Sequence, residues 1–122
     1  MGLGVWTHLT QRYYPLQLLQ DHHNSLIDQL DGQGLLVYVE PRSRVPSALY
    51  TRATACAWED PVIKLNTGDV LRNGTVYDPH GRPMSIVRPM QVFTRWYGFA
   101  YTFPGCEIWA PATDSLGETL AP

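Results

Sequence analysis

The chain has 122 residues, of which 44% are hydrophobic and 16% are charged, and its formal net charge is −2. This near-neutral charge, without a basic stripe, argues against nucleic-acid binding, which depends on basic residues that contact phosphates. No run of eighteen apolar residues exists, so we expect no transmembrane segment. We expect one domain over residues 1–112 and a flexible polar tail over residues 113–122.

The N-terminus lacks a basic start followed by an apolar stretch, which is the pattern of a signal peptide. The default expectation is therefore a cytoplasmic protein.

The first clear element runs from Pro15 to Gly32. Its apolar residues share one face at 100° per residue, which predicts an amphipathic helix. Proline suits the first turn of such a helix and glycine suits its C-terminal cap. The residues on this face are Leu16, Leu19, Leu26, Ile27 and Leu30.

The middle of the chain is predicted to form short strands. The run 35–39 predicts a buried strand, a loop with two prolines follows, and 48–58 predicts a second strand. Segments from 62 to 87 alternate with turns, and Asn73-Gly74 is a strong two-residue hairpin signal. We expect an antiparallel meander there.

The stretch from Met90 to Trp109 holds seven of the fourteen aromatic residues. As a strand it would place Tyr97, Phe99, Tyr101 and Phe103 on one face, and as a helix it would have an apolar stripe. Its length favours a helix, and Pro104-Gly105 would end either element. The fold class that follows is α+β, with an N-terminal amphipathic helix, an antiparallel meander and a C-terminal aromatic helix.

Five residues are candidates for chemistry. On the predicted helix, His23 points into the apolar face, where it is either a structural histidine bonded to a carbonyl or a ligand or acid–base group. Asp78 and His80 could join His22 or His23 in a metal site, although Asp-Pro-x-Gly is also ordinary turn chemistry. The candidates for catalysis are His23, Asp28, Asp78 and His80, and those for a metal are His22, His23 and His80.

Other site chemistry has no support in the sequence. Cys56 and Cys106 lack metal-ligand spacing, and we expect two inert thiols, with one bridge between them as the alternative. Neither a glycine-rich phosphate loop nor a nucleophile elbow is present. We therefore predict no cofactor.

Two blocks together resemble a known family. The block from Tyr13 to Arg52 and the closing block from Phe93 to Trp109 are similar to the bacterial and archaeal family called domain of unknown function 3179. The resemblance implies a helix over 92–103 and a strand over 107–109. The residues in register are Tyr14-Pro15-Leu16, His23, Asp28, Gly32 and the run 35–39, and Arg52 matches the family's closing arginine with one inserted residue.

The chain also departs from this family. Glu40-Pro41-Arg42-Ser43 stands where the family has Cys-Pro-Leu-Cys, so any thiol chemistry of the family is lost at that position. The resemblance carries no activity, because the family's function is open, and family members may be exported.

Three functions fit these observations. The first is a non-catalytic accessory subunit that binds another protein chain, because aromatic residues and arginine dominate interface energetics. The second is a homo-oligomeric structural domain, and the third is a small metal-binding or acid–base enzyme centred on His23. We expect Phe93, Trp96 and Phe103 to fill the core. The predicted interface residues are Arg95, Trp96, Tyr97, Phe99 and Tyr101.

Overall fold

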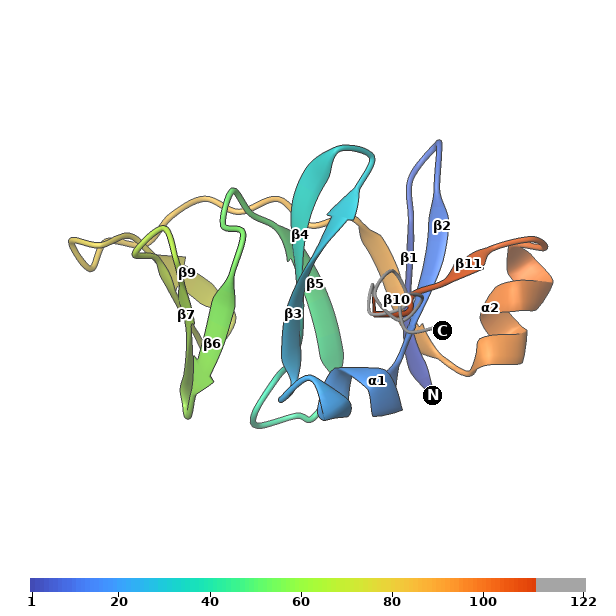
Figure 1. Ribbon diagram of the computed structural model, residues 1–122, viewed down its shortest axis with the longest axis horizontal. Helices are drawn as coiled ribbons and strands as arrows, with labels where there is room; N and C mark the ends of the chain where they lie inside the picture. The colour runs from blue at the N-terminus through green and yellow to red at the C-terminus, as the bar shows by residue number, and fades with distance from the viewer. Residues whose placement is uncertain (112–122) are drawn as a thin grey trace, which may run out of the picture.

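The computed structural model describes residues 1–111, and the predicted tail 113–122 lies outside the described residues. Sheets predominate, with two short helices (Figure 1). The elements are β1 (Gly2–Trp6), β2 (Gln11–Pro15), α1 (Leu16–Asp21), β3 (Ser25–Leu30), β4 (Gln33–Val39), β5 (Pro46–Tyr50), β6 (Cys56–Glu59), β7 (Val62–Leu65), β8 (Val70–Arg72), β9 (Thr75–Tyr77), β10 (Met90–Thr94), α2 (Trp96–Thr102) and β11 (Glu107–Ile108).

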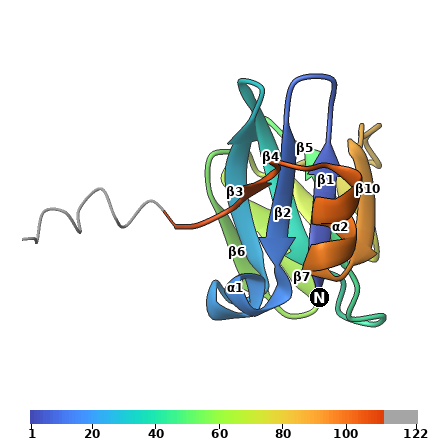
Figure 2. The same ribbon diagram turned by 90° about the vertical axis from the view of Figure 1, so that its right-hand side faces the viewer.

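The strands form three sheets that stack as layers (Figure 1). Sheet A has the strand order β10-β1-β2-β11, sheet B has β3-β4-β5, and sheet C has β6-β7-β8-β9. All strand pairs are antiparallel except β11 with β2. Sheet B is the middle layer, and α2 covers the face of sheet A that points away from it (Figure 2).

Strand β4 holds the molecule together because both of its faces are buried. Successive side chains of a strand point to opposite faces, so Leu35, Val37 and Val39 join the cluster between sheets A and B. Leu36 and Tyr38 join the cluster between sheets B and C. The continuous apolar run of this predicted strand reflects burial on two sides, and the prediction is confirmed.

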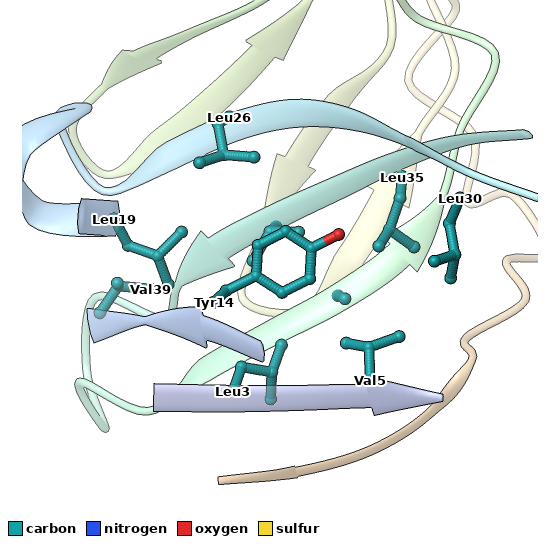
Figure 3. Packing of buried hydrophobic residues seen from close by; sticks show 10 residues of the cluster. Leu3, Val5, Tyr14, Leu19, Leu26, Leu30, Leu35 and Val39 are labelled. Carbon is teal, nitrogen blue, oxygen red and sulfur yellow. The ribbon is translucent and has the colours of Figure 1, made fainter. Parts of the chain in front are cut away.

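Tyr14 lies in the middle of the cluster between sheets A and B (Figure 3). Leu3 and Val5 of β1 approach it from one side and Leu26 and Leu35 of sheet B from the other (Figure 3). Helix α1 closes one end of this core with its buried Leu19.

The predicted helix over 15–32 is wrong in its second half. Helix α1 ends at Asp21, and β3 begins at Ser25. Between them His23 and Asn24 have φ values of 60° and 68°, which cannot continue a right-handed helix. Leu26 and Leu30 also fit a period of two, so the helical stripe was a coincidence of spacing.

Two hairpins have turns of the same kind. Asp31 and Gly32 join β3 to β4 with φ values of 53° and 80°, and Asn73 and Gly74 join β8 to β9 with 51° and 79°. Positive φ at both central residues is the requirement of a type I′ turn. The second hairpin confirms its prediction, whereas Asp31-Gly32 was interpreted as the end of a helix.

The predicted strand over 48–58 is two strands in different sheets. β5 ends at Tyr50, and β6 begins at Cys56 in sheet C. The side chain of Asn66 holds the connection, because its Oδ1 accepts from the Thr54 and Ala55 N–H groups at 3.0 and 3.3 Å. The meander is confirmed for β7, β8 and β9 and stops at Tyr77.

The chain returns from sheet C to sheet A past the edge of β5. Gln91 pairs with Ala48 in the manner of a strand backbone, accepting from its N–H at 2.8 Å and donating to its carbonyl at 3.1 Å. Arg88 donates to Ser47 Oγ at 2.8 Å and to the Tyr38 hydroxyl at 3.2 Å. These two side chains join the segment 88–91 to sheet B.

The predicted helix over 92–103 begins later than expected. Residues 90–94 form β10, whose register with β1 pairs Val92 with Gly4, and α2 begins at Trp96. The helix itself is confirmed, and so is a strand after it, β11. Within residues 1–111, neither helix is long and apolar enough to cross a lipid bilayer.

Candidate functional site

The histidines do not gather at a site. His23 is exposed in the turn after α1, so it does not point into an apolar helix face as the sequence predicted. His22 is half-buried, with its Nδ1 2.9 Å from the Leu18 carbonyl and its ring edge-on to Trp109. His22 therefore behaves as a structural histidine.

Asp28 belongs to a network that joins three strands. Its Oδ2 accepts from Arg12 Nη1 at 2.8 Å and from the Tyr14 hydroxyl at 2.7 Å. Arg12 also donates from Nε to Glu107 at 2.7 Å. Burial first, and then the Asp28 carboxylate, raise the pKa of Tyr14 well above its ordinary value. The Tyr14 hydroxyl therefore stays protonated and donates to Asp28. We call this network a clamp, because its contacts hold β2, β3 and β11 together.

Asp78 and His80 form a turn. The Oδ1 of Asp78 accepts from the N–H groups of His80 and Arg82, both at 2.9 Å. These bonds, that from Arg82 foremost, lower the pKa of Asp78. Asp78 therefore caps a turn, as is ordinary for the sequence Asp-Pro-x-Gly. The side chain of His80 is exposed.

The described residues contain no group of three or more histidine, cysteine, aspartate or glutamate side chains able to hold a metal ion. Cys56 and Cys106 are both free. Burial raises the pKa of each thiol, most clearly for Cys56, so neither has the activated thiolate of a nucleophile.

The outer face of sheet A differs from the rest of the surface. Directly paired residues of neighbouring strands face the same side, so Val92, Gly4, Tyr13 and Ile108 form one row across the four strands. Phe99 of α2 packs onto the middle of this row and is 2% exposed. The ends of the row, Val92 and Ile108, stay exposed on either side of the helix.

Among residues 1–111, six of the ten exposed large hydrophobic residues lie on α2 or beside it on this face, and we call them the outer aromatic surface. Tyr101 is 88% exposed, Tyr97 67% and Trp96 38%. The remaining four residues with exposed large hydrophobic side chains, Met1, Leu9, Val45 and Val87, lie in other parts of the sequence. The six members are Met90, Val92, Trp96, Tyr97, Tyr101 and Ile108.

The rings beneath this surface fix the helix. Phe99 lies 5.8 Å from Tyr13 and 5.0 Å from Phe103 between ring centroids, and Phe103 lies 5.3 Å from Trp6. The predicted core residues Phe93 and Phe103 are half-buried, whereas Trp96 is partly exposed with its ring edge-on to Tyr13. Phe99, predicted as an interface residue, is instead the buried anchor.

The outer aromatic surface carries little charge. From Trp96 to Cys106 the sequence has no charged residue, and Arg95 and Glu107 flank this run. Arg95 is exposed, and its Nη1 donates to the Tyr97 hydroxyl at 3.1 Å. Met90, Val92 and Ile108 were missed from the sequence. Val92 was assigned to the expected helix, which hid the alternation of β10, and Met90 and Ile108 lie outside that helix.

No family model, curated protein or solved structure matches this chain. The similarity to domain of unknown function 3179 therefore stays a prediction from the residues quoted above.

Proposed function

We propose that this protein is a non-catalytic accessory subunit that binds another protein chain through the outer aromatic surface. The observation that carries the proposal is the concentration of exposed apolar side chains, three of them aromatic, on one face that carries little charge. A contiguous apolar patch on a soluble domain marks an interaction site. Tyrosine and tryptophan supply large contact area at low cost in side-chain entropy.

The rigidity of this surface supports the proposal. Trp96 rests edge-on against Tyr13, and Phe99 fixes the helix to the sheet through the space above Gly4. The helix that carries the exposed rings is therefore fixed on the sheet, which lowers the entropy lost on binding.

An enzyme has weaker support. Asp28 is engaged by Arg12 and Tyr14, Asp78 caps a turn, and His23 and His80 are exposed in separate turns. A catalytic site needs such groups to converge on one reacting atom.

The test is purification of tagged full-length protein from its native host, with companions identified by mass spectrometry. The test variant is the double substitution Tyr97→Ser and Tyr101→Ser. The control is the double substitution Leu9→Ser and Val45→Ser, which removes exposed apolar side chains elsewhere. A stoichiometric companion should be lost with the first variant and kept with the control. A companion kept equally by both would contradict the proposal.

Self-association through the same surface is the second candidate, because an apolar face without charge repulsion also suits an isologous dimer. Light scattering on the purified protein separates the two. If the protein is a dimer that the double substitution Tyr97→Ser and Tyr101→Ser converts to a monomer, the self-association proposal replaces the accessory-subunit proposal. If the protein is a monomer that binds the companion, the accessory-subunit proposal stands.

A further inference from the structure

Strand β10 forms one edge of sheet A, and no strand of residues 1–111 pairs with its outer side (Figure 2). The edges at β5 and β9 are closed by other parts of the chain. The Gln91 side chain and the Val87 carbonyl bond to the outer side of β5. The Met84 N–H donates to the Val76 carbonyl of β9. Within the described residues, β10 has no such cover.

The hydrogen-bond pattern of β1 shows which backbone groups of β10 are free. The Thr7 N–H donates to the Thr10 carbonyl at 2.8 Å. Bonding alternates along an antiparallel pair, so the odd-numbered residues of β1 bond to β2 and the even-numbered ones to β10. Val92 is paired with an even-numbered residue. The N–H and carbonyl groups of Gln91 and Phe93 therefore point away from β1, and they have no hydrogen-bond partner among residues 1–111.

β10 also lacks the usual protection of an exposed edge. Natural sheets guard such edges with charged residues, proline or a bulge, because unpaired backbone can pair with another chain. The sequence of β10, MQVFT, has no charge and no proline, and its register with β1 has no bulge. Its outward side chains, Met90 and Val92, belong to the outer aromatic surface and are 63% and 42% exposed. A strand added here would therefore extend that surface and place its own apolar side chains beside Val92.

The charges beside β10 are positive. Arg88 lies two positions before the strand and Arg95 directly follows it, and both are exposed. Their side chains bond only to hydroxyl and carbonyl oxygens of residues 1–111, and neither makes an ion pair there. Antiparallel pairing with β10 of a second copy, centred on Val92, would bring Arg95 of each copy close to Arg88 of the other. Like charges across neighbouring strands are destabilising, so the charges favour an acidic strand instead.

We propose that the partner chain binds with an extended acidic segment, which adds to sheet A as a fifth strand beside β10. The backbone of this segment pairs with Gln91 and Phe93. Its apolar side chains lie beside Val92, and its carboxylates lie near Arg88 and Arg95. This assignment rests on the proposed function and adds the secondary structure and the charge of the partner's binding element.

The experiment uses a fluorescein-labelled peptide amide, Glu-Thr-Val-Thr-Val-Thr-Val-Glu, and measures fluorescence anisotropy with the full chain. A dissociation constant on the order of 100 μM is expected at low salt. Two further peptides carry N-methyl groups, one on all valine nitrogens and the other on all threonine nitrogens. Alternate N–H groups of a strand point to opposite edges, so one methylated peptide should bind like the parent and the other should lose binding. Equal affinity of the two methylated peptides would overturn the proposal.

Two measurements locate the peptide on the protein. Arg95→Gln should weaken binding about threefold, since exposed ion pairs contribute modestly, whereas the control Arg82→Gln, in a turn after β9, should leave it unchanged. In the free protein, the N–H groups of Gln91 and Phe93 should exchange with solvent faster than that of Val92, and the peptide should slow their exchange. Equal protection of the three N–H groups without peptide would contradict the free edge.

The outcomes separate this proposal from the proposed function. No binding at about 1 mM, or a dimer of this protein that the peptide dissociates, would overturn the acidic-strand proposal. A companion that is lost with Tyr97→Ser and Tyr101→Ser but does not protect the N–H groups of Gln91 and Phe93 would also overturn it, while the proposed function stands. A companion kept by that double variant contradicts the proposed function whatever the peptide does.

Discussion

The ring of Phe99 lies directly against Gly4, where a Cβ atom would overlap the Cδ1 and Cε1 atoms of the ring. Gly4 is one of the two middle residues of the row that crosses sheet A on its outer face. Because Gly4 has no side chain, the ring of Phe99 can pack against the sheet and anchor α2. The position of the outer aromatic surface therefore depends on a glycine at this position.

Gly4→Ala should displace α2 from the sheet. The added methyl group must move Phe99, and overpacking of this kind costs about 1–3 kcal/mol. Thermal unfolding followed by circular dichroism measures the loss, and tryptophan fluorescence reports Trp96 as it leaves Tyr13. Gly32→Ala is the control for space, because nothing lies within 4 Å of its Cβ position, although its φ of 80° adds backbone strain. Unchanged stability and fluorescence in Gly4→Ala would show that the ring accommodates the methyl group.

Asp28→Ala should be more destabilising than Tyr14→Phe. The first substitution leaves the buried Tyr14 hydroxyl without its acceptor and breaks the ion pair with Arg12. An unsatisfied buried polar group costs about 1–3 kcal/mol, whereas removal of the hydroxyl itself costs less. Urea unfolding of both single variants and the double variant gives the coupling between the two residues. Strictly additive losses would contradict the clamp.

Gln91→Glu should make stability depend on pH. Gln91 Nε2 donates to the carbonyls of Ala48 and Pro89 at 3.1 and 3.0 Å, so a carboxylate there would face two acceptors. The glutamate pKa in the folded state would rise above its unfolded value, so the loss of about 1–3 kcal/mol is present at neutral pH and is relieved as pH falls through the folded pKa. Unfolding free energies of Gln91→Glu and of the wild type should converge in acid, and Gln91→Met, which cannot titrate, should show no convergence.

Asp31 should add a pH dependence near the tips of two hairpins. It accepts from the Thr7 and Thr10 hydroxyls, both at 2.6 Å, and the bond from Thr10 foremost lowers its pKa below 3.8. A carboxylate with a lowered folded pKa stabilises the protein above its unfolded pKa, and this contribution disappears as pH falls through the folded value. In Asp31→Asn the acid slope of unfolding free energy should be shallower than in the wild type. Equal slopes would show that the hydroxyls leave the ionisation unperturbed.

The sequence determined several elements by itself because their signals are local. The apolar run of β4, the hairpin at Asn73-Gly74 and an aromatic helix before Pro104-Gly105 each depend on neighbouring residues only.

Tertiary structure decided the rest. Leu26 and Leu30 fit a helical face and a strand face equally well, and the choice of strand comes from pairing with β4 and from burial against sheet A. Contacts far apart in sequence also decided which rings are buried. Phe99 is buried because Gly4, ninety-five positions earlier, leaves room for it, while Tyr97 and Tyr101 find no such partner and stay exposed. Periodicity gives the side of an element on which a residue lies, but only the packed fold determines whether that side meets protein or water.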